Sequence, residues 1–272
     1  MKNHPRLRIS QSLIKDWWDY KEQKLCGPLW EALWVSRIIT YDDISDSEVM
    51  KCGSRFEYEL TGALDYYGKV PEIPCTKAGK PIAKMQYLLD LIPIFIEVVA
   101  KYNIEEIKIN EIWEYNAGEY DCTVRPDMWC LVDKVPAVID IKTTGLLSSR
   151  SSKFEDYGWD LESLPYKHKL VIQPIHTKFM ATEVKHIQDV PFYWLIFSNT
   201  GSGEVEFIEA RVEQDRLLNH VNMLDTLYGE IMDEIDLGIA KYPSVSSCKE
   251  CPLKGNCTSR ALAPVTKSIL IR

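Results

Sequence analysis

Residues 119–145 read EYDCTVRPDMWCLVDKVPAVIDIKTTG, and this stretch decides the fold. It contains two β-rich runs, 120–132 and 137–142, with a break between them that includes Asp133 and Pro136. Apolar and β-branched residues dominate both runs, whereas the residues of the break are typical of a turn. The stretch therefore predicts a β-hairpin.

Charged side chains occupy particular positions on this hairpin. Asp127 lies late in the first run, and Asp140 and Lys142 lie at the end of the second. Because residues i and i+2 of a strand share a face, Asp140 and Lys142 point the same way, while Ile139 and Ile141 point into the core. Two carboxylates and an ammonium group are costly to bury, and a metal ion would offset that cost. The plain alternative is a solvated Asp-x-Lys pair, worth about 0 to 1 kcal/mol.

The order of these residues resembles a known nuclease core. Asp127, followed by Asp140-Ile141-Lys142 and then by 143–145 (TTG), is similar to the core of the PD-(D/E)XK nuclease superfamily, closest to its RecB-like exonuclease branch. The resemblance implies that Asp127 and Asp140 bind Mg²⁺ or Mn²⁺, with the Ile141 carbonyl completing the shell. It also implies that Lys142 orients the attacking water or stabilises the transition state.

The same resemblance assigns a third carboxylate. Related nucleases carry G-x-x-x-H or G-x-x-x-E on the helix before the sheet, and Gly53 to Glu57 has this spacing within a helix expected at 45–67. Glu57 is therefore a predicted metal ligand. Glu59 is its rival, and the plain alternative is that Glu57 is a solvated carboxylate beside Arg55.

A glutamine is assigned on the helix that follows the hairpin. RecB-like nucleases place Q-x-x-x-Y there, and Gln173 has a suitable position in the expected helix 164–182. This chain departs from the motif, because Thr177 stands where Tyr is expected and Pro174 follows the glutamine. Lys169 and His176 are alternative polar residues on this helix, although such residues are more often surface lysines or satisfied core histidines.

Other elements follow from periodicity and from helix-capping residues. An N-terminal helix within 8–30 is capped by Ser10 or Ser12 and ends at Cys26-Gly27-Pro28. The further expectations are a buried helix at 81–102 kinked at Pro93, a first strand at 104–115, an antiparallel strand pair at 190–198 and 203–211, and a long amphipathic helix at 212–240.

Eight cysteines, in a sequence without the apolar core of a signal peptide, do not indicate a disulfide scaffold. Cys248, Cys251 and Cys257 form C-x2-C-x5-C near the end of the chain, which suits a soft metal centre. Together with Cys26 they resemble the ligands of the iron–sulfur nucleases of the AddB type and of CRISPR adaptation. The resemblance implies a 4Fe–4S cluster in a cap formed by 8–30 and 242–260. Zn²⁺ is the alternative, because four thiolates also suit zinc.

The remaining four cysteines are expected to be ordinary buried thiols: Cys52, Cys75, Cys122 and Cys130.

Composition limits the class of protein. The chain has 272 residues, 46% of them hydrophobic, which is enough for one large domain. A net charge of −8 argues against a large positively charged surface that binds nucleic acid, although a local groove can still be basic. With no run long enough to cross a membrane, a cytoplasmic protein is expected.

We therefore predict an α/β fold of restriction-endonuclease type, in which a central mixed sheet is flanked by helices and the iron–sulfur cap joins the two termini. The chain is expected to be a single nuclease domain, 1–272, with a core at 45–211. The resemblance implies a DNA exonuclease that prefers single strands. One alternative is a DNA-binding or assembly subunit with protein partners in a recombination or CRISPR-adaptation complex. The other is a zinc-stabilised structural protein.

Overall fold

The computed structural model describes residues 6–22, 24–40, 47–65, 68–145, 168–238 and 253 of the chain. Its helices are α1 (Gln11–Lys21), α2 (Gly27–Trp34), α4 (Glu48–Thr61), α5 (Ala83–Leu89), α6 (Ile92–Lys101), α8 (Lys169–Met180), the π-helical turn η1 (Ala181–Lys185) and α9 (Gln214–Leu237). Its strands are β1 (Arg8–Ile9), β2 (Glu105–Ile109), β3 (Trp113–Asn116), β4 (Asp121–Val124), β5 (Met128–Val132), β6 (Val135–Thr144), β7 (Phe192–Ser198) and β8 (Val205–Ala210).

A mixed five-stranded sheet of order β2-β5-β6-β7-β8 forms the centre of the fold. The β6–β7 pair is parallel and the other neighbours are antiparallel. The predicted hairpin is β5–β6, in which Val132 pairs with Val135 across Asp133 and Lys134. Both turn residues have positive φ, 47° and 68°, as the tightest two-residue hairpin turns require. The predicted β7–β8 pair is also confirmed.

A second, three-stranded sheet of order β1-β4-β3 was not predicted. The expected run 120–132 is two strands, β4 and β5, which belong to different sheets, and the expected strand 104–115 likewise divides into β2 and β3. The chain leaves the large sheet near Asn110, which has a φ of 53°, and returns after Pro126, which has no N–H for a ladder. These two positions explain why the single-strand predictions were wrong.

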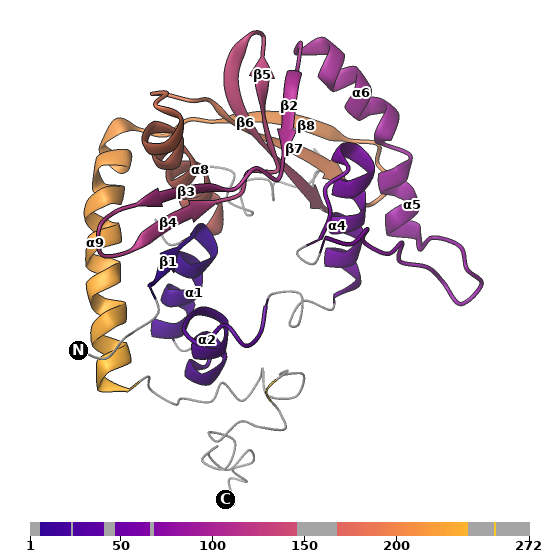
Figure 1. The fold of residues 1–272 in the computed structure, drawn as a ribbon. Coiled ribbons are helices and arrows are strands. Elements are labelled where there is room, and N and C mark those ends of the chain that lie inside the picture. The colour runs from indigo at the N-terminus through magenta and orange to yellow at the C-terminus, as the bar shows by residue number, and fades with distance from the viewer. Residues whose placement is uncertain are drawn as a thin grey trace, which may run out of the picture.

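The central sheet separates two groups of helices (Figure 1): α4, α5 and α6 lie on one side and α1, α8 and α9 on the other. Alternate residues of β6 divide between the two cores, because successive side chains point to opposite faces. Val138 joins the core beneath α1, α8 and α9, whereas Ile139 and Ile141 join the core beneath α4 and α5. Asp140 and Lys142 therefore lie on the α8 side of the sheet.

Two helix predictions need correction. The expected single helix at 81–102 is α5 followed by α6, and Pro93 lies in the first turn of α6, where its missing N–H costs nothing. This segment is also less buried than expected, since Phe95 is the one buried residue of α6 and Ile96 is 62% exposed. Its broad apolar surface therefore contacts the core only on one side.

The N-terminal region contains two helices instead of one. Ser10 caps α1 as predicted, accepting a hydrogen bond from the Leu13 N–H. That helix ends at Lys21, and Cys26 is the N-cap of α2, with Pro28 in its first turn. Cys26-Gly27-Pro28 thus begins a helix and does not end one. The long C-terminal helix, α9, is confirmed within the described part of its expected range.

No helix in the described ranges is long and apolar enough to cross a membrane.

Candidate active site

Asp140 and Lys142 stand on the middle strand of the central sheet. Each pairs in register with β7, Asp140 opposite Trp194 and Lys142 opposite Ile196, so the strand holds both side chains rigidly. Asp140 is buried at 3% exposure, and the Lys142 ammonium is ion-paired with its Oδ2 atom. The Lys142 side chain is 25% exposed, so the Asp-x-Lys sequence forms a largely buried ion pair and not a solvated one.

Asp127 belongs to the link by which the chain re-enters the large sheet. Its Oδ2 accepts a hydrogen bond of 2.7 Å from the Ile141 N–H, which lies between Asp140 and Lys142 in the sequence. Burial raises the pKa of Asp127 well above its ordinary value, and the charges of Asp140 and Glu57 raise it further. The hydrogen bond fixes Asp127 against the strand that carries the Asp-x-Lys pair.

Glu57 reaches the same region from α4. Burial raises the pKa of Glu57, as does the nearby charge of Asp140, while Arg125 and Lys142 act in the opposite direction. Gly53, one turn earlier, faces β6: a Cβ at that position would lie 3.4 Å from the Thr143 Oγ1, an ordinary van der Waals contact. This part of α4 therefore packs directly against the strand that carries Asp140.

The rival carboxylate, Glu59, is engaged elsewhere. The Arg55 Nε donates to Glu59 Oε1 at 2.8 Å, and the guanidinium makes a second contact with the same oxygen. Arg55 therefore pairs with Glu59 and not with Glu57, contrary to the plain alternative for Glu57.

Gln173 connects α8 to the centre. Its Nε2 donates a hydrogen bond to Asp140 Oδ1, so Asp140 is held by Lys142 on one oxygen and by Gln173 on the other. Gln173 is 5% exposed, and its Oε1 is buried without a hydrogen-bond partner in the described structure. Thr177, in the position of the expected tyrosine, is buried. The glutamine thus lies at the predicted place, although its motif is incomplete.

His176 lies away from this centre and is a satisfied core histidine. Its Nδ1 is 3.0 Å from the Nε2 of His220, and its Nε2 is 3.1 Å from the Thr123 carbonyl oxygen. Lys169, in contrast, lies four residues before Gln173, on the same face of α8.

Arg125 is the charged neighbour that the sequence prediction missed. It precedes Pro126-Asp127, and its guanidinium lowers the pKa of Glu57. Arg125 lies two residues before the predicted ligand Asp127, and this short spacing could have identified it as part of the site.

The donor chemistry of the centre suits a hard cation, since Glu57, Asp127 and Asp140 all offer carboxylate oxygens. Their mutual repulsion, which raises the pKa values of Glu57 and Asp127, is the kind that a divalent cation relieves. In the described ranges, however, no group of three His, Cys, Asp or Glu side chains has the arrangement of a metal site. Asp140 instead contacts Lys142 and Gln173, so Mg²⁺ or Mn²⁺ binding stays a prediction.

The iron–sulfur prediction involves Cys26, which is buried at the start of α2. Its three expected partners, Cys248, Cys251 and Cys257, lie outside the described residues. Leu253, which lies between the second and third of them in the sequence, packs against an apolar cluster of Cys26, Leu29 and Leu33. Leu253 therefore lies beside α2.

The other cysteines are mostly as expected. Cys52, Cys122 and Cys130 are buried, and burial raises the pKa of each thiol. Cys75 is exposed, which corrects its assignment as a buried thiol.

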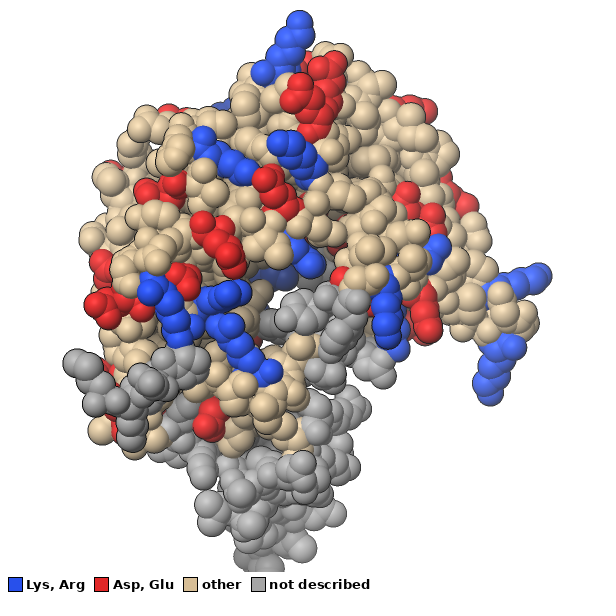
Figure 2. Space-filling model, viewed as in Figure 1, with Lys and Arg blue, Asp and Glu red and all other residues tan. Residues whose placement is uncertain are grey.

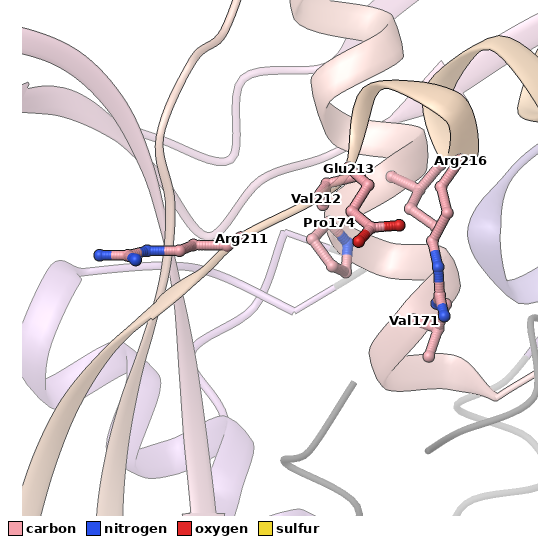
Figure 3. Close-up of a pocket in the computed structure, with 7 residues that line it drawn as sticks. Val171, Pro174, Arg211, Val212, Glu213 and Arg216 are labelled. Carbon is pink, nitrogen blue, oxygen red and sulfur yellow. The ribbon is translucent and has the colours of Figure 1, made fainter. Parts of the chain in front are cut away.

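A separate cavity of about 170 Å³ lies between α8 and the start of α9. Val171, Pro174 and Ile175 line it from the face of α8 opposite to Gln173. In Figure 3, Arg216 extends beside Val171, while Arg211 points away from Pro174. None of the predicted site residues lines this cavity, so it is distinct from the Asp140 centre.

The viewed surface is not uniformly acidic despite the net charge of −8. Figure 2 shows lysine and arginine side chains gathered beside a hollow, over the region of α1 and β1. A local basic surface thus exists on an acidic protein.

No protein-family model matches this sequence, and no curated protein matches it. Among solved structures, the chain is similar to a protein from Eubacterium rectale described as a "putative exonuclease", at 16% identity and a TM-score of 0.61. The similarity covers 96% of this chain and 90% of that one. A second structure, SSO0001, is 14% identical over 94% of this chain and 87% of its own, but its TM-score of 0.36 is too low to carry an argument. The chain thus shares the mixed α/β fold of the Eubacterium rectale protein over nearly its whole length.

Proposed function

We propose that this chain is a metal-dependent nuclease of the PD-(D/E)XK type that hydrolyses phosphodiester bonds of DNA, acting as an exonuclease that prefers single strands. The observation that carries the proposal is the buried Asp140–Lys142 pair, joined to Asp127 through the Ile141 N–H and to α8 through Gln173. Fold similarity to a protein described as an exonuclease supports it.

The residues of the centre have separate tasks in this proposal. Glu57, Asp127, Asp140 and the Ile141 carbonyl would hold Mg²⁺ or Mn²⁺, which lowers the pKa of a bound water and offsets charge on the phosphate. Lys142 donates to the attacking water or to the phosphate oxygens, where negative charge develops. Gln173 fixes the orientation of Asp140 through its amide, as residues behind a ligand commonly do.

We also propose that Cys26, Cys248, Cys251 and Cys257 hold a 4Fe–4S cluster that joins the ends of the chain. The packing of Leu253 against Cys26 supports this, because the leucine is flanked in sequence by Cys251 and Cys257. The cluster would stabilise the domain and would not take part in hydrolysis.

The test is cleavage of end-labelled single-stranded and duplex DNA by the anaerobically purified protein, with Mg²⁺, with Mn²⁺ and with a chelator. We expect metal-dependent shortening from an end, faster on single strands. Asp140→Asn and Lys142→Met should each lower the rate at least a hundredfold, whereas Glu97→Gln on the exposed side of α6 should not. An inactive wild-type protein would contradict the proposed activity, and an active Asp140→Asn variant would contradict the proposed site.

A further inference from the structure

We propose that Lys169 contacts a phosphate of the bound strand, next to the phosphate that reacts at Asp140 and Lys142. That the bound strand is DNA rests on the proposed function. Lys169 would bind this strand without belonging to the reacting centre of Asp127, Asp140 and Lys142.

The position of Lys169 on α8 directs it to the centre. Lys169 and Gln173 are one helical turn apart on the same face, and Gln173 is bonded directly to Asp140. Consistent with this placement, the charged groups that act on Lys169 are Lys142, Asp140, Asp127 and Lys15 of α1. Lys169 thus lies one turn from the residue that joins α8 to β6.

Lys169 lacks the ion pair that usually accompanies a structural lysine. No hydrogen bond or ion pair joins it to another residue in the parts of the chain that the structure describes, and its side chain is exposed. Lys15 and Lys185, in contrast, are each ion-paired with a carboxylate. Although the side chain keeps access to solvent, the surrounding protein partly desolvates the ammonium, and this and the Lys142 charge lower the pKa of Lys169, while Asp140 and Asp127 raise it. An added anion would favour the charged form.

Its location in the helix is unfavourable for stability. Lys169 is the first residue of α8, whose first turn contains no acidic residue, and a cation at this end opposes the helix dipole. The next three N–H groups of this turn donate to His168, so an anion would be held here by the Lys169 ammonium. The neighbouring Gln173 Oε1 is buried and has no hydrogen-bond partner in the described structure, so the face of α8 that carries Lys169 also holds an unsatisfied polar atom.

The start of α8 lies beside α1, over which lysine and arginine side chains gather. Lys15, on α1, acts electrostatically on both His168 and Lys169, so α1 and the start of α8 face a common space. Figure 2 shows lysine and arginine side chains beside the hollow over α1. A strand that leaves the reacting phosphate past α8 would meet this surface, and Lys169 would be its first contact.

The test is binding of a labelled oligothymidylate of about twelve nucleotides, measured by fluorescence anisotropy in chelator between about 50 and 200 mM salt. Lys169→Met should weaken binding several-fold at low salt and reduce the slope of log K against log salt by about 0.7, the value for one phosphate of a single strand. Lys169→Arg should retain the slope. Lys178→Met is the matched control. Lys178 lies on the same helix, but the charged groups that act on it are Glu209 and Asp189, which are not part of the Asp140 centre.

The outcomes separate the two proposals. A Lys169→Met variant with the affinity and salt slope of a DNA-binding wild type overturns the phosphate contact, whether or not the wild type cleaves DNA. A wild type that shows Lys169-dependent binding but never cleaves DNA with Mg²⁺ or Mn²⁺ overturns the proposed nuclease activity alone. A wild type that binds no DNA overturns both.

Discussion

Gln173 on α8 donates its side-chain amide to Asp140 on β6, so the helix after the hairpin is bonded directly to the central carboxylate. Gln173 lies in the connection between the parallel strands β6 and β7, and Asp140 lies on β6. This bond makes the orientation of Asp140 depend on the position of α8.

Gln173→Met, which keeps the size of the side chain but removes the donor, should therefore lower kcat/KM about tenfold to a hundredfold. Asp140 would keep Lys142 as its partner but lose the second group that fixes its plane. Initial rates on a single-stranded substrate measure the effect, and Gln214→Met at the exposed start of α9 is the control. A Gln173→Met enzyme with full kcat/KM would show that the bond does not position Asp140 for catalysis.

Glu57→Gln should stabilise the fold while abolishing cleavage. The pKa of Glu57 is raised in the folded protein by burial and by Asp140, so its ionised form costs folding free energy at neutral pH. This cost is absent below the ordinary pKa and is fully present once the pH has risen through the raised one. We expect the neutral amide to increase the free energy of unfolding at pH 7 by about 1 kcal/mol, as measured by urea denaturation.

Glu59→Gln is the matched control for that experiment. It should lower stability slightly, because Arg55 would lose its carboxylate partner, and it should leave cleavage intact. If Glu59→Gln abolished cleavage and Glu57→Gln did not, Glu59 and not Glu57 would be the metal ligand.

The relative placement of Asp140, Lys142 and the nearby turn follows from the local sequence. Asp140 and Lys142 share a face because strand periodicity requires it, and the turn at Asp133 followed from composition. The choice between Glu57 and Glu59 could not be made in this way, since both lie on one helix. It depends on which part of α4 packs against β6, and Gly53 lies in that part.

The division of the strands into two sheets could not be predicted from this sequence, because it also depends on contacts between distant segments. The β-rich pattern runs almost unbroken through 120–132, and nothing in it indicates that β4 and β5 pair with different partners. Strand pairing is decided by contacts between distant segments, such as β4 with β1. Pro126 marked the break, but a proline alone does not identify a change of sheet.

The buried His176–His220 pair should make the protein less stable in acid. The Thr123 carbonyl can only accept, so His176 Nε2 carries the proton and His176 Nδ1 accepts from His220 Nε2. Burial lowers the pKa of His176 to about 4, and burial together with His176 lowers the pKa of His220. Protonation of His176 would place two N–H groups against each other.

The sign of the effect follows from this lowered pKa. Between the ordinary pKa and the lowered one the unfolded chain binds more protons, so the contribution of His176 is complete above about pH 6.5 and is lost as the pH falls towards 4. The loss is on the order of 3 kcal/mol. Urea denaturation between pH 7 and pH 4 measures it. A His176→Met, His220→Leu double variant should show a shallower dependence on pH, and the exposed His186→Asn should match the wild type.

Cys26→Ser should remove the proposed cluster and loosen the ends of the domain. If Cys26 and the three C-terminal cysteines share one centre, the variant purified anaerobically should lose most of its iron and its visible absorption. By analogy with a cross-link that closes a long loop, about 4 to 5 kcal/mol of stability would be lost, a decrease in Tm of roughly 10 °C. Cys75→Ser, at an exposed cysteine, should change neither the iron content nor the Tm.

Leu253→Asp provides an independent variant, because it leaves all four cysteines in place while disrupting the contact with Cys26, Leu29 and Leu33. A charged residue in this apolar cluster should lower the Tm and speed the loss of iron in air. A wild-type protein that contains stoichiometric zinc and no iron would instead favour the structural zinc site. In that case the nuclease proposal would rest on Asp140, Lys142 and their neighbours alone, because the link from the cysteines to the iron–sulfur nucleases would be lost.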